Sequence, residues 1–172
     1  VRVKTPIILP TIMITDGRQK IGCDRYGATI RNRGRIMIKI AIPGSGGRMG
    51  GMLIRAIATA PDLELVAASD LPDSPFIGRD AGEVAQIGAN GVMIGSDPEA
   101  RFGVADVVID FTSPAASLHH ASLAAAKGTA MVIGTTGLDA EDEGALKALA
   151  KDNRIIYCAN TSVGVTLLTQ LV

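Results

Sequence analysis

IKIAIPGSGGRMG, residues 38–50, is the most informative segment of this sequence. A short apolar strand runs directly into a glycine-rich turn, and a helix is expected to follow. Glycines at positions 44, 46 and 47 let the backbone turn tightly and come close to a ligand. The first turn of a helix offers unpaired N–H groups and the positive end of its dipole to a phosphate. The segment therefore predicts a pyrophosphate site, for which a dinucleotide is the natural ligand.

The turn departs from the strict GxGxxG pattern, because Met49 stands where the third glycine belongs and Gly50 follows one residue late. A glycine-rich turn alone is weak evidence, since many such strings are ordinary loops. Support comes from LELVAASD at residues 63–70, a predicted strand that ends in an acid 24 residues after Gly46. An acid about 20 residues beyond the turn binds the adenosine ribose in dinucleotide folds. Asp70 is the candidate, and a solvated loop acid is the alternative.

Two later runs, VVIDFTSP at residues 107–114 and MVIGTTG at residues 131–137, are apolar and end in small hydroxylated residues or glycine. Strand ends that line a ligand crevice at one edge of a parallel sheet have this composition. Each run could also be a tight turn with a Ser or Thr cap.

Strands and helices alternate from residue 37 onward. Strands are expected at residues 38–42, 63–70, 92–94, 106–111, 129–133 and 154–158, and helices at 48–60, from 97 onward, at 114–127 and at 139–151. A long loop is expected from residue 71 to about residue 90. Such alternation predicts an α/β fold with a doubly wound parallel sheet, the Rossmann arrangement. The first helix is expected to pack on the sheet through Met49, Met52, Leu53, Ala56 and Ile57.

The motifs GSGGRMG, AASD, DFTSP, VIGTTG and CANTSVGV occur in the order and spacing of one family, and residues 37–172 resemble it without an evident gap. The family is 4-hydroxy-tetrahydrodipicolinate reductase, also called dihydrodipicolinate reductase. The resemblance implies a cytoplasmic, usually homotetrameric enzyme of bacterial lysine and diaminopimelate biosynthesis. In this reaction NADH or NADPH gives a hydride to a cyclic dicarboxylate imine, a small-molecule substrate.

The resemblance also implies which residues bind the cofactor. They are Gly44, Ser45, Gly46, Gly47, Arg48 and Met49 at the pyrophosphate, Asp70 at the ribose, and Gly134, Thr135, Thr136, Cys158, Ala159, Asn160 and Thr161 near the nicotinamide. Thr136 is also expected to contact the substrate carboxylate. Position 161 is often Phe in the family, so the Thr found here puts ring packing at the nicotinamide in doubt.

No catalytic residue is expected in this chain. The family's proton donor and substrate clamp, a His-His pair with a nearby Lys and an SGT loop, lie in a second domain that follows CANTSVGV. We therefore expect a C-terminally truncated, cofactor-binding part that is inactive alone, because the imine must be protonated and its carboxylates held. A stand-alone dinucleotide-binding or sensing module is the alternative. Another oxidoreductase, such as aspartate or homoserine dehydrogenase, fits less well because it lacks the GGRMG and GTTG pair.

Two departures from the family concern the choice of cofactor. Leu71 follows the ribose acid where many members have Arg, and Ser113 stands where some place a basic residue. Neither side chain can bind a 2′-phosphate by charge, and Asp70 would repel that phosphate by about 1 kcal/mol or more. We predict NADH over NADPH, unless Arg79 in the long loop supplies the missing charge.

Composition excludes several classes of protein. Hydrophobic residues make up 47% and charged residues 20% of the chain, as in ordinary globular proteins, and the formal net charge of zero argues against nucleic-acid binding. No apolar run approaches the roughly 20 residues that cross a bilayer, so a soluble protein is expected. Cys23 and Cys158 are far apart and are expected to be reduced thiols. Spacings typical of metal ligands are absent from the sequence.

Residues 1–36 differ in composition from the rest. They carry eight Lys or Arg against two Asp, a net charge of +6 that the remainder balances with −6. A transit peptide would also be basic, but it is normally rich in Ser, and this segment has none. We expect residues 1–36 to be a disordered or non-native extension and residues 37–172 to form the dinucleotide-binding domain. A basic arm for an acidic partner is the alternative.

Other polar residues are expected to be structural. His119 and His120 lie inside a predicted helix, where neighbouring side chains point about 100° apart, so we do not expect both to contact one substrate. The acids of DAEDE, residues 139–143, begin a helix and are expected to cap its free N–H groups.

Overall fold

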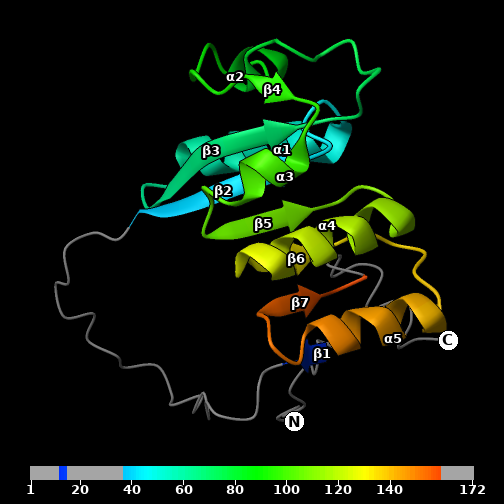
Figure 1. Ribbon diagram of the computed structural model, residues 1–172. Coiled ribbons are helices and arrows are strands. Elements are labelled where there is room, and N and C mark those ends of the chain that lie inside the picture. The colour runs from blue at the N-terminus through cyan, green and yellow to red at the C-terminus, as the bar shows by residue number, and fades with distance from the viewer. Residues whose placement is uncertain (1–11, 15–36, 160–172) are drawn as a thin grey trace, which may run out of the picture.

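The computed structural model describes residues 12–14 and 37–159, and it forms a mixed sheet between two layers of helices (Figure 1). In chain order the elements are β1 (Ile12–Ile14), β2 (Ile38–Pro43), α1 (Arg48–Thr59), β3 (Leu63–Ser69), α2 (Ala81–Val84), β4 (Ile94–Gly95), α3 (Pro98–Phe102), β5 (Val107–Asp110), α4 (Pro114–Lys127), β6 (Ala130–Ile133), α5 (Ala140–Leu149) and β7 (Ile155–Tyr157).

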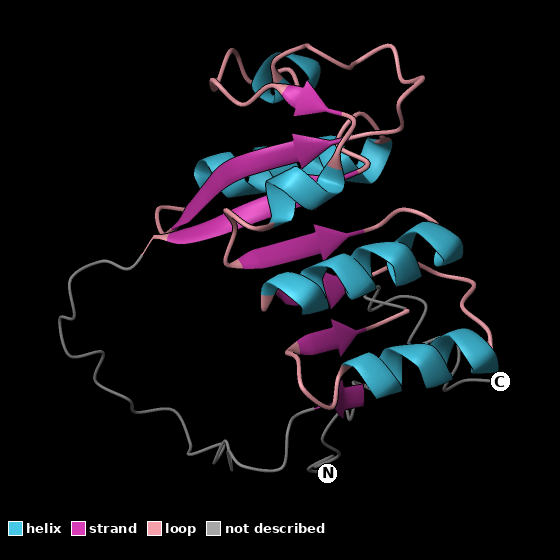
Figure 2. Cartoon of the chain, in the orientation of Figure 1, coloured by secondary structure: helices cyan, strands magenta, loops and turns pink. Residues whose placement is uncertain are grey.

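The strand order is β1-β7-β6-β5-β2-β3-β4, and β2 to β7 are parallel. The chain builds outward from β2 through β3 to β4, returns to place β5 on the other side of β2, and continues through β6 to β7. The strand order therefore reverses between β2 and β5, which is where open α/β sheets bind ligands. The arrowheads of the parallel strands point to one edge of the sheet (Figure 2). The predicted doubly wound parallel sheet is confirmed.

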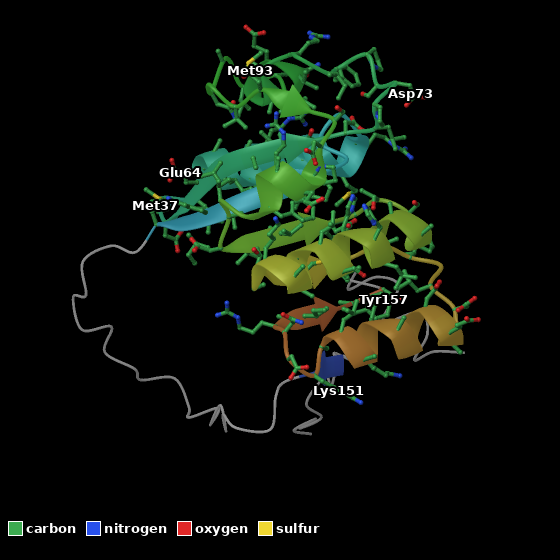
Figure 3. All side chains as sticks on the ribbon, viewed as in Figure 1. Met37, Glu64, Asp73, Met93, Lys151 and Tyr157 are labelled. Atoms are coloured by element: carbon green, nitrogen blue, oxygen red, sulfur yellow. The ribbon has the colours of Figure 1, made fainter. Side chains whose placement is uncertain are left out.

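Alternate residues of β2 pack into two separate cores, because successive side chains of a strand point to opposite faces. Ile40 and Ile42 contact the layer of α1 and α2, whereas Ala41 faces α3, α4 and α5. Figure 1 shows α3, α4 and α5 in front of the sheet and α1 behind it. Tyr157 at the end of β7 lies beside α5 (Figure 3), in the core of that front layer.

Most predicted elements are found within one or two residues of their expected bounds. The helix predicted at residues 114–127 ends at Gly128, whose left-handed backbone (φ 69°) only glycine adopts readily. Asp139 caps α5 by accepting from the backbone N–H groups of Glu141 and Asp142, as expected for the DAEDE acids. The predicted strand at residues 92–94 is shifted and appears as β4.

The predicted apolar face of α1 is correct at two of its five residues. Met49, Met52 and Ala56 are exposed, and the buried positions are Gly50, Gly51, Ile54 and Ile57. Hydrophobicity alone favoured the methionines, but close packing of the helix start against the glycine turn selects the face that carries small residues. Leu53 and Ile57 pack on the core as expected.

Two elements were not expected from the sequence. Helix α2 lies inside the predicted long loop and begins at Asp80, a buried acid whose Oδ1 accepts from the N–H groups of Gly82 and Glu83. Backbone N–H groups, that of Asn90 foremost, outweigh burial and hold the pKa of Asp80 below its usual value. Strand β1 pairs antiparallel with β7 at the sheet edge. The rest of residues 1–36 lies outside the described residues, so the extension stays a prediction.

Within the described residues, no helix has both the length and the apolar character needed to cross a bilayer.

Candidate functional site

The glycine turn lies at the carboxyl end of β2 and is tied to the end of β3. Gly44 has a left-handed backbone (φ 65°), and Gly47 donates from its N–H to the Gly44 carbonyl at 3.0 Å. The buried Ser45 donates twice to the Ser69 carbonyl, from its backbone N–H at 3.0 Å and from Oγ at 3.1 Å. The sequence motif thus forms the tight turn that the segment predicts.

Gly50 takes the part that the strict pattern assigns to its third glycine. A Cβ at this position would overlap the Gly44 carbonyl oxygen and lie 2.7 Å from Ser45 Cα. Only glycine therefore lets α1 lie this close to the turn. The third glycine of the motif therefore stands one residue later than in the strict pattern, at position 50, and it still allows α1 to pack closely against the turn.

The start of α1 is left open for an anion. Its N-cap, Gly47, has no side chain to satisfy the first N–H groups, and the first turn contains no acidic residue. Arg48 and Met49 at the helix start are exposed. Unpaired N–H groups and the helix dipole attract a phosphate to such a terminus.

Asp70 follows β3 and contacts the glycine turn directly. Its Oδ2 accepts from Gly46 N at 3.0 Å and from Ser74 Oγ at 3.1 Å, and its Oδ1 accepts from Leu71 N at 2.8 Å. A Cβ at Gly46 would overlap both Asp70 Oδ2 and the ring of Phe76. The acid and the turn, 24 residues apart in sequence, therefore form one site.

A buried acid at the end of β5 forms a second cluster, which the sequence analysis did not identify. Asp110 is fully buried, and its Oδ1 accepts from Thr112 N at 2.9 Å, Thr112 Oγ1 at 2.7 Å and Ser117 Oγ at 3.1 Å. Its Oδ2 lies 2.7 Å from His120 Nδ1. Burial alone would raise the pKa of this carboxyl, but the hydrogen bonds from His120 and Thr112 outweigh it and hold the pKa below its usual value. Asp110 is therefore ionised. The aspartate of VVIDFTSP, at the end of a predicted strand, was the sequence feature from which this cluster could have been predicted.

The GTTG loop after β6 joins this cluster. The Thr135 hydroxyl is buried, lies 2.7 Å from Ser117 Oγ and donates to Asp110 Oδ1 at 3.4 Å. Its side chain is thus occupied inside the protein, and only its backbone is available to a ligand. Thr136, the next residue, is exposed. Gly134 packs so closely on the Phe111 ring that a Cβ would overlap it.

The last predicted site segment begins at the end of β7. Cys158 is half-buried and donates from its N–H to the Ile133 carbonyl at 2.9 Å, which places it beside the end of β6. Ala159 is exposed. Asn160 and Thr161 lie outside the described residues.

A cleft of about 520 Å³ joins the glycine turn, Asp70 and the first turns of α4. This volume is within the range of about 300–1,000 Å³ typical of small-molecule sites. Its lining includes Gly44, Gly47, Ser69, Asp70, Leu71, Pro72, Ser96, Phe111, Thr112, Ser113, Ala116, His119 and His120. Both histidines line this cleft, although the sequence analysis did not expect them to contact one substrate, and that expectation stays a prediction. No Lys or Arg is among its described lining residues.

A second hollow of about 630 Å³ lies between α3 and the strands β3 and β4. Arg101 is one of its lining residues, and its Nη1 donates to the Met93 carbonyl at 3.0 Å. Neither the glycine turn nor the Asp110 cluster contributes to it. Figure 3 shows Met93 at this end of the sheet, far from Tyr157.

Comparison with known proteins agrees with this geometry. A sequence profile described as "Dihydrodipicolinate reductase, N-terminus" matches residues 38–161. The 4-hydroxy-tetrahydrodipicolinate reductase of Brucella abortus (strain 2308) is 48% identical over 133 residues, which cover 77% of this chain and 50% of that protein. The protein of the same name from Alkalilimnicola ehrlichii shows the same identity and coverage. The chain spans about half the length of the curated relatives it matches.

Solved structures show the same fold. Dipicolinate-bound dihydrodipicolinate reductase from Paenisporosarcina sp. TG-14 superposes with a TM-score of 0.61 at 27% identity, over 79% of this chain and 52% of that one. Homoserine dehydrogenase of S. aureus superposes with a TM-score of 0.56 at 14% identity, over 72% of this chain and 33% of that one. At that low identity the second likeness concerns the fold alone.

Proposed function

The chain belongs to the dihydrodipicolinate reductase family, and on that premise we propose that it is the cofactor-binding part of an NAD(P)H-dependent reductase. The reaction is the reduction of 4-hydroxy-tetrahydrodipicolinate to tetrahydrodipicolinate in lysine and diaminopimelate biosynthesis. The observation that carries the proposal is the contact between Gly46 of the glycine turn and Asp70. This contact joins the loop after β2, the proposed anion site, to Asp70 after β3, the proposed ribose acid.

The described residues fit a dinucleotide. The N–H groups of Arg48 and Met49 at the start of α1 would hold the pyrophosphate, where Gly46 and Gly50 leave no room for a Cβ. The ribose hydroxyls donate to Asp70, whose position is fixed by Ser74. The reduced nicotinamide would supply a hydride when bound, and the loop at Gly134, Thr135 and Thr136 is proposed to hold it next to the substrate. Thr136 contacts the substrate carboxylate in this proposal.

The described lining favours NADH over NADPH. Leu71 follows Asp70 with 67% of its surface exposed, and Ser113 is exposed at the cap of α4, so neither position offers a cation. A 2′-phosphate on the ribose would approach the Asp70 carboxylate without a compensating Lys or Arg in the lining. Arg79 in the loop after β3 is the alternative source of charge, and its Cζ lies 5.8 Å from the centroid of the Phe76 ring.

Titration calorimetry with NADH and NADPH tests the cofactor preference. We expect tighter binding of NADH, and we expect Leu71→Arg to bring NADPH to equal or tighter binding. Leu71→Gln is the matched control, since it is polar without charge. Tighter binding of NADPH by the unaltered chain, lost in Arg79→Ala, would contradict the proposal and assign the missing charge to Arg79.

The alternative is a stand-alone module that binds or senses the dinucleotide without turnover. An assay of NADH oxidation with the cyclic imine separates binding from catalysis. We propose that residues 37–172 supply the cofactor site and do not turn over the imine by themselves, because the family's proton donor and substrate clamp belong to a second domain. The homotetramer and the cytoplasmic location are likewise part of the proposal. NADH oxidation by residues 37–172 without a second domain would contradict the proposal that the proton donor and substrate clamp lie elsewhere.

A further inference from the structure

His120 is held in one orientation by the buried Asp110. It lies on α4, with its Nδ1 2.7 Å from Asp110 Oδ2. Its ring meets the ring of Phe102 edge to face, at a centroid distance of 5.5 Å and an interplanar angle of 71°. Only 12% of its side chain is exposed. Both contacts are made by groups in the protein interior, so the ring has little freedom to turn.

The Asp110 contact determines which ring nitrogen carries the hydrogen. An ionised carboxylate can only accept, so in the neutral imidazole Nδ1 is the donor and Nε2 keeps its lone pair. Among the described residues, every buried side-chain nitrogen or oxygen has a hydrogen-bond partner. His120 Nε2 has no hydrogen-bond partner among these residues, so it cannot be one of the buried atoms. The Nε2 atom is therefore accessible, and the exposed part of His120 lines the cleft.

The surroundings of this acceptor suit a flat apolar ring. The same cleft is lined by Leu71 and Pro72 after β3, and by Phe111 and Ala116 around the start of α4. Asp70, the proposed ribose acid, lines the same cleft. A purine attached to that ribose would thus lie between apolar walls, with His120 Nε2 as a neutral acceptor at the histidine end.

We infer that His120 Nε2 accepts a hydrogen bond from the exocyclic amino group of the cofactor's purine, so that the cleft selects a 6-aminopurine over a 6-oxopurine. Asp110 is the positioning residue, because it fixes the tautomer that makes Nε2 an acceptor. The inference rests on the proposed function, namely that this cleft holds a dinucleotide. A 6-oxopurine places a carbonyl oxygen at the same point, where two acceptors would face each other unpaired.

Titration calorimetry at pH 8.5, where imidazole side chains are ordinarily neutral, tests the inference with NADH and its hypoxanthine analogue. We expect the unaltered chain to bind NADH about tenfold more tightly, as an unsatisfied polar group predicts. His120→Asn keeps an amide donor near the place of Nδ1 and removes the Nε2 acceptor, so the preference should fall to near unity. His120→Gln, which offers an amide oxygen near the place of Nε2, should restore part of it.

Asp110→Asn tests the positioning role. The amide group of Asn can donate a hydrogen bond to Nδ1. The neutral imidazole can then adopt the opposite tautomer, in which the hydrogen is on Nε2. We expect the preference for NADH to be lost and the ¹⁵N NMR signals of His120 to report a shift from the Nδ1–H to the Nε2–H tautomer. Ser122→Ala, an exposed change on the same helix, should alter neither. If Asp110→Asn does not fold, the His120→Asn result decides.

Three outcomes would overturn the inference. Equal binding of both nucleotides by the unaltered chain would refute it and leave the proposed function standing. Loss of the preference in His119→Gln, with retention in His120→Asn, would assign the contact to the neighbouring histidine, whose ring centroid lies 6.0 Å away. Failure of both nucleotides to bind would refute the inference and the proposed function together.

Discussion

Asp70 carries the strongest single-residue prediction. Its carboxylate is already fixed by Gly46 and Ser74, so it meets the ribose without reorganising. Asp70→Asn keeps the shape and removes the charge. We expect NADH affinity to fall about tenfold, as for loss of one charge-assisted hydrogen bond, and NADPH affinity to fall less because the 2′-phosphate is no longer repelled.

The matched control is Asp73→Asn, an exposed acid of the same loop, which Figure 3 shows at its outer rim. Titration of both variants with both cofactors checks the prediction. If both substitutions changed cofactor affinity equally, Asp70 would act only through its negative charge at a distance, and its proposed contact with the ribose would be refuted.

Asp110 predicts how stability depends on pH. Its pKa in the folded protein lies below the value of about 3.9 for an unfolded Asp. A depressed folded pKa stabilises the native state above the unfolded pKa, and that stabilisation is lost as pH falls through the folded pKa. We expect the free energy of unfolding to fall below about pH 4, and to fall less steeply in Asp110→Asn.

Urea unfolding across this pH range measures the effect. Asp80→Asn should also flatten the profile, because the pKa of Asp80 is lowered by backbone N–H groups. Asp152→Asn, at an exposed acid, serves as the control. A profile for Asp110→Asn as steep as that of the unaltered chain would show that Asp110 contributes nothing to acid stability.

At the level of elements, the joint between the glycine turn and α1 depends on Gly50. Gly50→Ala would force the helix start away from Gly44, and we expect a loss of about 1–3 kcal/mol in the free energy of unfolding together with weaker NADH binding. Gly51→Ala is the matched control, since its Cβ would meet nothing closer than Arg55 Nη2 at 4.0 Å. That control should be neutral or stabilising by up to about 1 kcal/mol.

Thermal unfolding and NADH titration of the two variants provide the comparison. Similar behaviour of Gly50→Ala and Gly51→Ala would contradict the close approach between α1 and the turn.

The elements themselves were largely predictable, because their ends carry local signals. Pro61 stops α1, Pro114 starts α4, and Gly128 ends α4. Hydrophobicity did not predict which face of α1 is buried. Gly50 is buried in place of Met49 because the helix backbone packs against the glycine turn, and this contact depends on the tertiary structure. Helix α2 was missed because Asp80 is stabilised by backbone N–H groups up to eleven residues away, at Gly91.

In the whole molecule, the site joins loops after β2, β3, β5 and β6. The sequence indicated each loop separately, and the fold class implied that they meet at one edge of the sheet. It did not reveal that Asp110 links Thr135 to His120, because that link depends on side-chain orientations across three elements. Nor did it place His119 and His120 on the same cleft, since adjacent helix positions can both border a wide opening.

The position of β1 gives a prediction for the extension. It pairs with β7 at one edge of the sheet, whereas the cleft lies between β2, β3 and β5. We expect a chain that begins at Met37 to bind NADH with unchanged affinity. A marked loss of affinity in calorimetry, with the fold retained by circular dichroism, would show that residues 1–36 contribute to the site.

The most direct test is a crystal structure of the chain grown with NADH. We predict the pyrophosphate at the start of α1, the adenosine ribose on Asp70, and the purine between Leu71 and His120. A dinucleotide found in the hollow beside Arg101, or a cleft left empty at saturating NADH, would contradict the proposal that this edge of the sheet is the cofactor site.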